Sequence, residues 1–153
     1  MGAGIWGSAF FAIFALMIII SRPLVGKVYA RYGSKFIIYP GLGLFILGLF
    51  CLGLATTPMA IIFTAPLLGL GYGAAQPAFQ ALAIQSAPIE RAGVSTATYF
   101  LALDISVGAG SIILALLANA LGYQYLYIIT ALVMVIALSL YHVWIKKYTP
   151  LEI

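Results

Sequence analysis

The chain has 153 residues, of which 65% are hydrophobic and only 7% are charged, and its mean hydropathy is +1.17. Soluble domains carry about 25% charged residues, so this composition excludes a water-soluble protein and predicts an integral membrane protein. The net charge of +4 comes from seven Lys and Arg residues against three acidic residues. A single cysteine, Cys51, cannot form an intrachain disulfide, and we expect it to be a small buried apolar residue.

Five apolar stretches follow one another along the chain, and each is about as long as, or longer than, the roughly 20 residues that a membrane-spanning helix needs. The predicted spans are residues 3–21, 36–55, 59–83, 94–118 and 122–145. The stretches are apolar on every face, whereas the strands of a membrane barrel alternate apolar and polar residues. They therefore predict an all-α polytopic membrane protein. No basic residue precedes the first stretch, so we interpret it as a retained span rather than a cleaved leader.

The connections between the spans predict the orientation of the chain, because Lys and Arg are enriched in cytoplasmic loops. The first connection holds Arg22, Lys27, Arg31 and Lys35, the third holds Glu90 and Arg91, and Lys146 and Lys147 follow the last span. The second and fourth connections hold no charge. We therefore predict an external N-terminus and a cytoplasmic C-terminus, and no nucleic-acid partner. An odd number of spans with this start suggests a piece of a longer protein.

The second and third spans are rich in small residues. Glycines 41, 43, 48 and 53 are expected at close contacts between helices, because small residues allow helices to approach one another in lipid. In the third span, Gly69, Gly73, Gln76 and Gln80 share one helix face, and Pro66 and Pro77 interrupt the backbone hydrogen bonds. The two glutamines either bind a neighbouring helix or line a cavity, and the pattern favours neither alternative.

The fourth span carries a carboxylate at membrane depth. Asp104 lies ten residues beyond Val94, which corresponds to roughly 15 Å of helix, and it shares one face with Gly108, Ser111 and Ala115. A charge there costs at least about 2.5 kcal/mol. Asp104 is either a substrate or proton site, which the prevalence of functional acids in membranes favours, or a neutral side chain hydrogen-bonded between helices.

The remaining polar residues favour no enzyme. His142 lies one turn from Lys146, where an interfacial role is favoured over a proton relay. The aromatic residues expected as interfacial anchors are Tyr123, Tyr125, Tyr127, Trp144 and Tyr148. One histidine, one cysteine and three acids do not assemble a nucleophile, a base and an orienting group. We expect no enzymatic activity, no metal and no cofactor.

The first connection resembles a loop of the major facilitator superfamily, specifically its drug:proton antiporter branch. In that family the loop joins the second and third helices of each half, and its pattern is matched here by Gly26, Arg31, Gly33 and Lys35. Ala30 stands where the family has an aspartate that helps to latch the cytoplasmic side. The resemblance therefore implies a cytoplasmic loop motif that lacks its acidic residue.

The segment from Gly69 to Ser111 resembles the tenth and eleventh helices of that branch with their connecting loop. The resemblance implies that Pro88, Glu90, Arg91 and Gly93 are loop positions, with Glu90 and Arg91 as the loop and helix-start candidates. It also implies that Asp104 and Gly108 belong to the eleventh helix. It covers nearly the whole chain and corresponds to helices eight to twelve. In such transporters substrate binds between two six-helix halves that alternate access to the two sides.

The sequence and the resemblance together lead to one functional hypothesis and one alternative. Residues 1–153 are expected to be the C-terminal portion of a proton-coupled transporter of the plasma membrane, which exports small amphipathic molecules or drugs. Asp104, Gln76 and Gln80 are its candidate substrate or proton sites. Its expected partners are the lipid bilayer, the substrate, protons and the missing N-terminal helices or a partner membrane protein. The alternative is a truncated, non-transporting membrane protein that acts through helix association.

Overall fold

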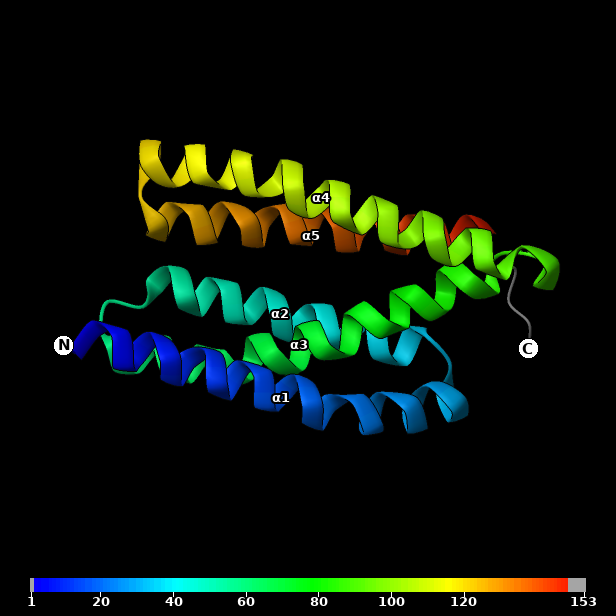
Figure 1. Ribbon diagram of the computed structural model, residues 1–153, viewed down its shortest axis with the longest axis horizontal. Helices are drawn as coiled ribbons and strands as arrows, with labels where there is room; N and C mark the ends of the chain where they lie inside the picture. The colour runs from blue at the N-terminus through cyan, green and yellow to red at the C-terminus, as the bar shows by residue number, and fades with distance from the viewer. Residues whose placement is uncertain (1, 149–153) are drawn as a thin grey trace.

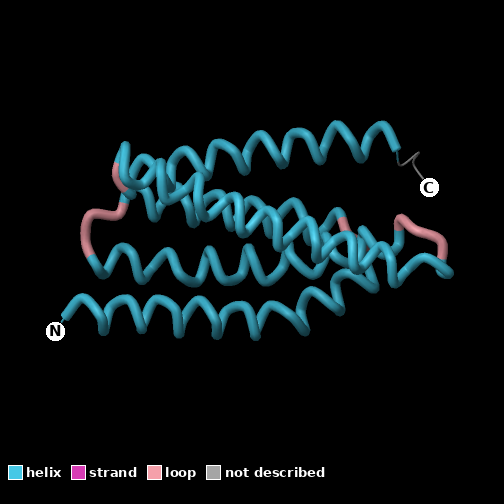
Figure 2. The backbone as a smooth tube through the Cα atoms, turned by 45° about the horizontal axis from the view of Figure 1, so that its top comes forward, coloured by secondary structure: helices cyan, strands magenta, loops and turns pink. Residues whose placement is uncertain are grey.

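The computed structural model describes residues 2–148, with the side chains of residues 4–143. The elements in this range are α1 (Gly2–Tyr32), α2 (Lys35–Leu54), α3 (Pro58–Gln85), the short 3-10 helix η1 (Ile89–Arg91), α4 (Ala92–Leu121) and α5 (Tyr123–Tyr148). The five long helices run side by side along one axis and are joined by short loops (Figure 2). All five are long and apolar enough to cross a membrane, which confirms the predicted all-α membrane fold.

Helix α1 is longer than the first predicted span and contains most of the first predicted connection. Pro23 lies inside the helix, because a proline removes one backbone hydrogen bond but does not end a helix whose other bonds are kept. The helix ends at Gly33, whose φ of +81° is a left-handed conformation that glycine adopts readily. The Gly33 N–H donates to the Tyr29 carbonyl at 3.0 Å and closes the last turn. Most of the predicted first connection is therefore helical.

The residues of the predicted loop motif lie mostly on helices. Gly26 and Arg31 belong to α1, Gly33 forms the turn, and Lys35 is the first residue of α2. The Arg31 guanidinium carbon lies 5.5 Å from the centre of the Tyr32 ring. Only Gly33 in this motif has a conformation that requires glycine.

Helix α3 is the centre of the packing. Helices α1 and α2 both pack against α3, and α5 packs against the other side of α2. Helix α4 lies at the edge beside α5, and the C-terminal end of α3 reaches across to it (Figure 1). None of the residues of α4 is buried, so this helix is the least covered of the five long helices.

Glycines allow the central helices to approach closely. A Cβ atom at Gly48 would lie 2.8 Å from the Leu68 side chain, and one at Gly53 would lie 2.8 Å from the Ile128 side chain. At Gly41 the nearest atom would be the Ala74 Cβ at 3.2 Å. The prediction of close contacts is confirmed for these three positions. It is wrong for Gly43, which has no atom within 4 Å of an added Cβ.

The outward faces of the helices are as apolar as their inward faces. Cys51 is exposed, contrary to the prediction that it is buried, because an apolar residue facing lipid carries no penalty and hydropathy cannot tell the two faces apart. Large apolar side chains such as Ile105, Val107 and Ile112 of α4 are likewise exposed. The side chains of Trp144, Lys146, Lys147 and Tyr148, for which interfacial or cytoplasmic positions were predicted, lie outside the described residues.

Helix α3 begins with a side-chain cap that supports a first prediction. The Thr57 hydroxyl accepts a hydrogen bond from the Ala60 N–H at 3.2 Å, and Pro58 follows as the first helical residue. We expect Thr57→Ala to lower the stability by about 1 kcal/mol, measured by unfolding in mixed micelles of increasing dodecyl sulfate content. Thr57→Ser keeps the hydroxyl and should restore the wild-type value. Equal stability of Thr57→Ala and wild type would show that the cap contributes nothing.

Candidate functional site

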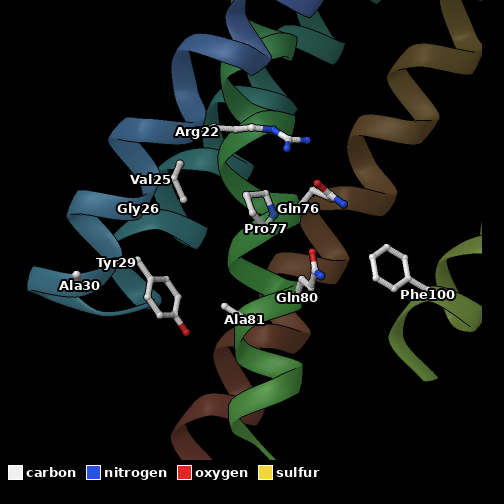
Figure 3. A pocket seen from close by; sticks show the side chains of 10 residues that line it. All are labelled: Arg22, Val25, Gly26, Tyr29, Ala30, Gln76, Pro77, Gln80, Ala81 and Phe100. Carbon is white, nitrogen blue, oxygen red and sulfur yellow. The ribbon is translucent and has the colours of Figure 1, made fainter. Parts of the chain in front are cut away.

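An open groove of about 630 Å³ lies between α1 and α3 (Figure 3). Its walls include Arg22, Val25 and Tyr29 of α1, Gln76 and Gln80 of α3, and Phe100 of α4. Pockets that hold small molecules have volumes of about 300–1,000 Å³. The groove is therefore large enough for a drug-sized molecule.

Along α3, glycines contact α1 as far as Gly73, and the groove begins directly after this contact, at Gln76. A Cβ at Gly69 would lie 2.6 Å from the Phe14 carbonyl, and one at Gly73 would meet the Ser21 hydroxyl and lie 2.9 Å from the Ile18 Cα. The next residues on this face are glutamines, whose longer side chains do not allow so close an approach. The shared face predicted from the sequence thus packs against α1 over its first half and lines the groove over its second half.

Gln76 and Gln80 are both half-buried, and their side chains extend into the groove (Figure 3). Within residues 4–143, neither side-chain amide has a protein hydrogen-bond partner, although both can donate and accept. Within the described chain both side chains line the groove, which favours the cavity-lining alternative over a contact with a neighbouring helix. Two amides are therefore available to a ligand.

Two tyrosines join the helices around the groove. The Tyr29 hydroxyl donates to Gln85 Oε1 at 2.8 Å and links α1 to the end of α3. The Tyr99 hydroxyl donates to the Gln76 carbonyl oxygen at 3.1 Å and links α4 to the middle of α3. These bonds hold the groove-lining helices in position, and the sequence analysis assigned neither tyrosine to the site.

Asp104 lies on the same face of α4 as Phe100, one turn further along the helix. Its side chain is exposed, and so are Gly108, Ser111 and Ala115. The Ser111 hydroxyl donates to the Gly108 carbonyl of its own helix at 2.8 Å. The face of α4 that carries Asp104, Gly108, Ser111 and Ala115 is thus uncovered within the described chain, on the side where Phe100 borders the groove.

Arg22 is the residue of this site that the sequence analysis missed. It was assigned to a cytoplasmic connection, but it lies on α1 and its guanidinium extends toward the Gln76 side of the groove (Figure 3). Its spacing of three, four and seven residues to Val25, Gly26 and Tyr29 would have shown that these residues share a helix face. Arg22 was assigned to the connection because the apolar stretch ends at residue 21, whereas the helix continues to Tyr32.

Glu90 and Arg91 lie away from the groove. Both are exposed on η1, and α4 begins directly after them at Ala92, so Gly93 belongs to the first helical turn rather than to a loop. His142, expected at the interface, is exposed on α5, and its Nδ1 lies 2.8 Å from the Tyr39 hydroxyl of α2. Within the described residues, no group of three or more His, Cys, Asp or Glu side chains is arranged to hold a metal ion.

Comparisons with known proteins match nearly the whole chain. Residues 3–152 match the family described as the Major Facilitator Superfamily. The uncharacterized MFS-type transporter YhhS of Escherichia coli O6:H1 (strain CFT073) is 29% identical over 151 residues, which cover 97% of this chain and 37% of the relative. YhhS of Escherichia coli K12 is 28% identical over 149 residues, covering 96% and 36%. YhhS of Salmonella enteritidis PT4 is 27% identical over 147 residues, covering 95% and 36%.

Proposed function

Because the chain belongs to the major facilitator superfamily, a family of multi-pass membrane transporters rather than enzymes, we propose that it is the C-terminal part of a proton-coupled transporter that exports small amphipathic molecules. The chain spans about 37% of the length of the YhhS relatives that it matches. Its five helices correspond to helices eight to twelve of the twelve-helix fold, as the resemblance of Asp104 and its surrounding helix to the eleventh helix implies.

The observation that carries this proposal is the groove beside the uncovered face of α4. It combines free amides of Gln76 and Gln80 with the apolar ring of Phe100, and Asp104 lies one turn from Phe100 on the same helix face. Polar groups at membrane depth normally face protein or water. The missing N-terminal helices cover this face and complete a central cavity between the two halves of the transporter.

In the proposed cycle, Asp104 binds a proton from one side of the membrane and releases it to the other side as the halves rock. Substrate occupies the groove between α1, α3 and α4, and its polar group binds the glutamine amides. The ends of the helices that carry Arg31, Lys35, Glu90 and Arg91 face the cytoplasm, and the start of α1 faces the outside of the plasma membrane. Outward substrate is exchanged against inward protons when the substrate-bound form and the Asp104-protonated form each change between the two states of the transporter but the empty form does not.

A first experiment measures the size of the native product through a tag on its C-terminus. A membrane protein far larger than 16.3 kDa supports a complete transporter. A stable product of about this mass that does not transport contradicts the proposal and supports the alternative, a short membrane protein that acts through helix association.

The second experiment tests transport itself in inverted membrane vesicles with a preformed proton gradient, monitored by a pH-sensitive dye. Addition of a transported amphiphile should release protons only from vesicles that hold the native product. We expect Gln76→Leu and Gln80→Leu each to lower this rate by about 2–10-fold, because each removes one neutral hydrogen-bonding group. Gln124→Leu is the matched control, since Gln124 is exposed on α5 and does not line the groove. Equal rates in all three variants would contradict the assigned groove.

A further inference from the structure

The groove carries a positive charge that the proposed cycle does not use. Arg22 lines it together with neutral residues only, and none of the residues that line it is acidic. Within residues 4–143, no carboxylate forms an ion pair with the Arg22 guanidinium. The local charge of the groove is therefore positive, although the chain contains Asp104 nearby on α4.

Arg22 lies deep along its helix rather than at the helix end. About ten residues, or roughly 15 Å of helix, separate it from Tyr32, where α1 ends. The Arg22 side chain is exposed on the wall of the groove, and a charged side chain on a membrane-spanning helix normally has a partner or faces water. The open groove supplies the space for such a partner.

The surroundings of Arg22 match one ligand chemistry. A guanidinium offers a planar fork of N–H donors that binds carboxylate, sulfonate or phosphate oxygens in pairs. The side-chain amides of Gln76 and Gln80 add further donors beside it, and Val25 and Phe100 supply apolar contacts (Figure 3). An oxyanion on an apolar body satisfies both parts of this surface.

We propose that Arg22 is a specificity-determining residue and that the groove binds organic anions, with the oxyanion on Arg22 and the apolar body toward Phe100. This inference rests on one part of the proposed function, namely that the groove is the site where substrate binds. The same chemistry is offered by free organic anions and by the headgroups of anionic lipids, so the test has an arm for each source.

The test measures binding rather than transport. The native product is purified into phosphatidylcholine nanodiscs, and its thermal unfolding is followed at constant ionic strength while 1-octanesulfonate or octyltrimethylammonium is added. Both probes have the same alkyl chain and a charge that does not titrate. A ligand that binds only the folded state raises the unfolding midpoint, so the shift yields an apparent Kd for each probe.

We expect 1-octanesulfonate to stabilise the wild-type protein and octyltrimethylammonium to have no effect. Arg22→Gln should weaken sulfonate binding about tenfold or more, because it removes a charged hydrogen-bond donor. Arg22→Lys should keep the preference for the anion with weaker binding. The matched control is Lys27→Gln, which removes a charge from an exposed residue of the same helix that does not line the groove.

A second arm replaces part of the phosphatidylcholine with phosphatidylglycerol. If lipid headgroups are the source of the oxyanion, phosphatidylglycerol stabilises the wild type but not Arg22→Gln, and it suppresses the sulfonate effect. If free anions are the source, the sulfonate effect persists in both lipids.

Equal stabilisation by the two probes, or equal sulfonate binding by wild type and Arg22→Gln, would overturn the inference. If Arg22→Gln does not fold, the inference is tested by comparing how 1-octanesulfonate and octyltrimethylammonium shift the unfolding midpoints of the wild type and of Arg22→Lys. Sulfonate binding without any transport would refute the proposed function and leave this inference intact. Transport of cationic amphiphiles without sulfonate binding would support the proposed transport function and overturn the inference that the groove binds organic anions.

Discussion

Asp104→Asn is expected to reduce transport driven by the proton gradient by about tenfold or more, which is within the range of typical coupling between two binding sites, about 5–150-fold. Asparagine keeps nearly the size of aspartate and can hydrogen-bond, but it does not bind and release a proton. Transport measured in vesicles at a series of external pH values should lose its dependence on the gradient. The unfolding midpoint should stay near that of the wild type, because asparagine has nearly the size of aspartate and the Asp104 side chain makes no hydrogen bond or ion pair within residues 4–143.

Ser106→Ala is the control for this experiment, since Ser106 is exposed on the same helix and its hydroxyl donates only to the Ala102 carbonyl of that helix. It lies two residues from Asp104, on a different helix face. Unchanged transport by Asp104→Asn over the whole pH range would refute the proton role. Such a result would support the alternative that Asp104 is a neutral residue hydrogen-bonded between helices.

Gly71→Ala is expected to destabilise the helix bundle by about 1–3 kcal/mol, the typical effect of overpacking. A Cβ at this position would lie 2.6 Å from the Phe45 backbone nitrogen and 2.7 Å from the Gly41 carbonyl oxygen. Both atoms belong to the backbone of α2, so only a displacement of α2 from α3 relieves the contact. The variant should unfold at a lower dodecyl sulfate content and accumulate less in membranes.

Alanine substitutions at two further glycines serve as comparisons for the stability of Gly71→Ala. At Gly48 the closest atoms to an added Cβ belong to the Leu68 side chain, which can change its rotamer, so Gly48→Ala should have a smaller effect. Gly43→Ala should be neutral or stabilising, because no atom lies within 4 Å of its added Cβ and alanine favours helix. Equal stability of Gly71→Ala and Gly43→Ala would contradict the close α2–α3 contact.

The candidate site was only partly visible in the sequence. Gln76, Gln80 and Asp104 attracted attention because polar side chains are costly in lipid, and this argument needs no tertiary structure. Arg22 was missed for a local reason, since the first apolar stretch ends at residue 21 and Arg22 was assigned to the charged connection that follows it. The roles of Tyr29 and Tyr99 depend on partners at residues 85 and 76, which no spacing along one helix reveals.

The sequence by itself determined the class of the protein, the number of its long helices and the approximate ends of all of them except the C-terminal end of α1. In a bilayer each spanning helix satisfies its own backbone hydrogen bonds and faces an apolar solvent, so hydropathy and length are sufficient. Gly33 and Gly122, both with positive φ, follow the ends of α1 and α4. These two helix ends therefore depend on a local property of glycine rather than on tertiary contacts.

Only the tertiary structure decided which helix faces meet and which remain open. Lipid and protein interior are similarly apolar, so hydropathy does not show whether an apolar residue such as Cys51 faces lipid or another helix. The groove exists because glycines bring α1 and α3 together at one end, while larger residues separate them further along. That difference arises from contacts between residues distant in the chain, and it places Arg22, Gln76 and Gln80 on one surface.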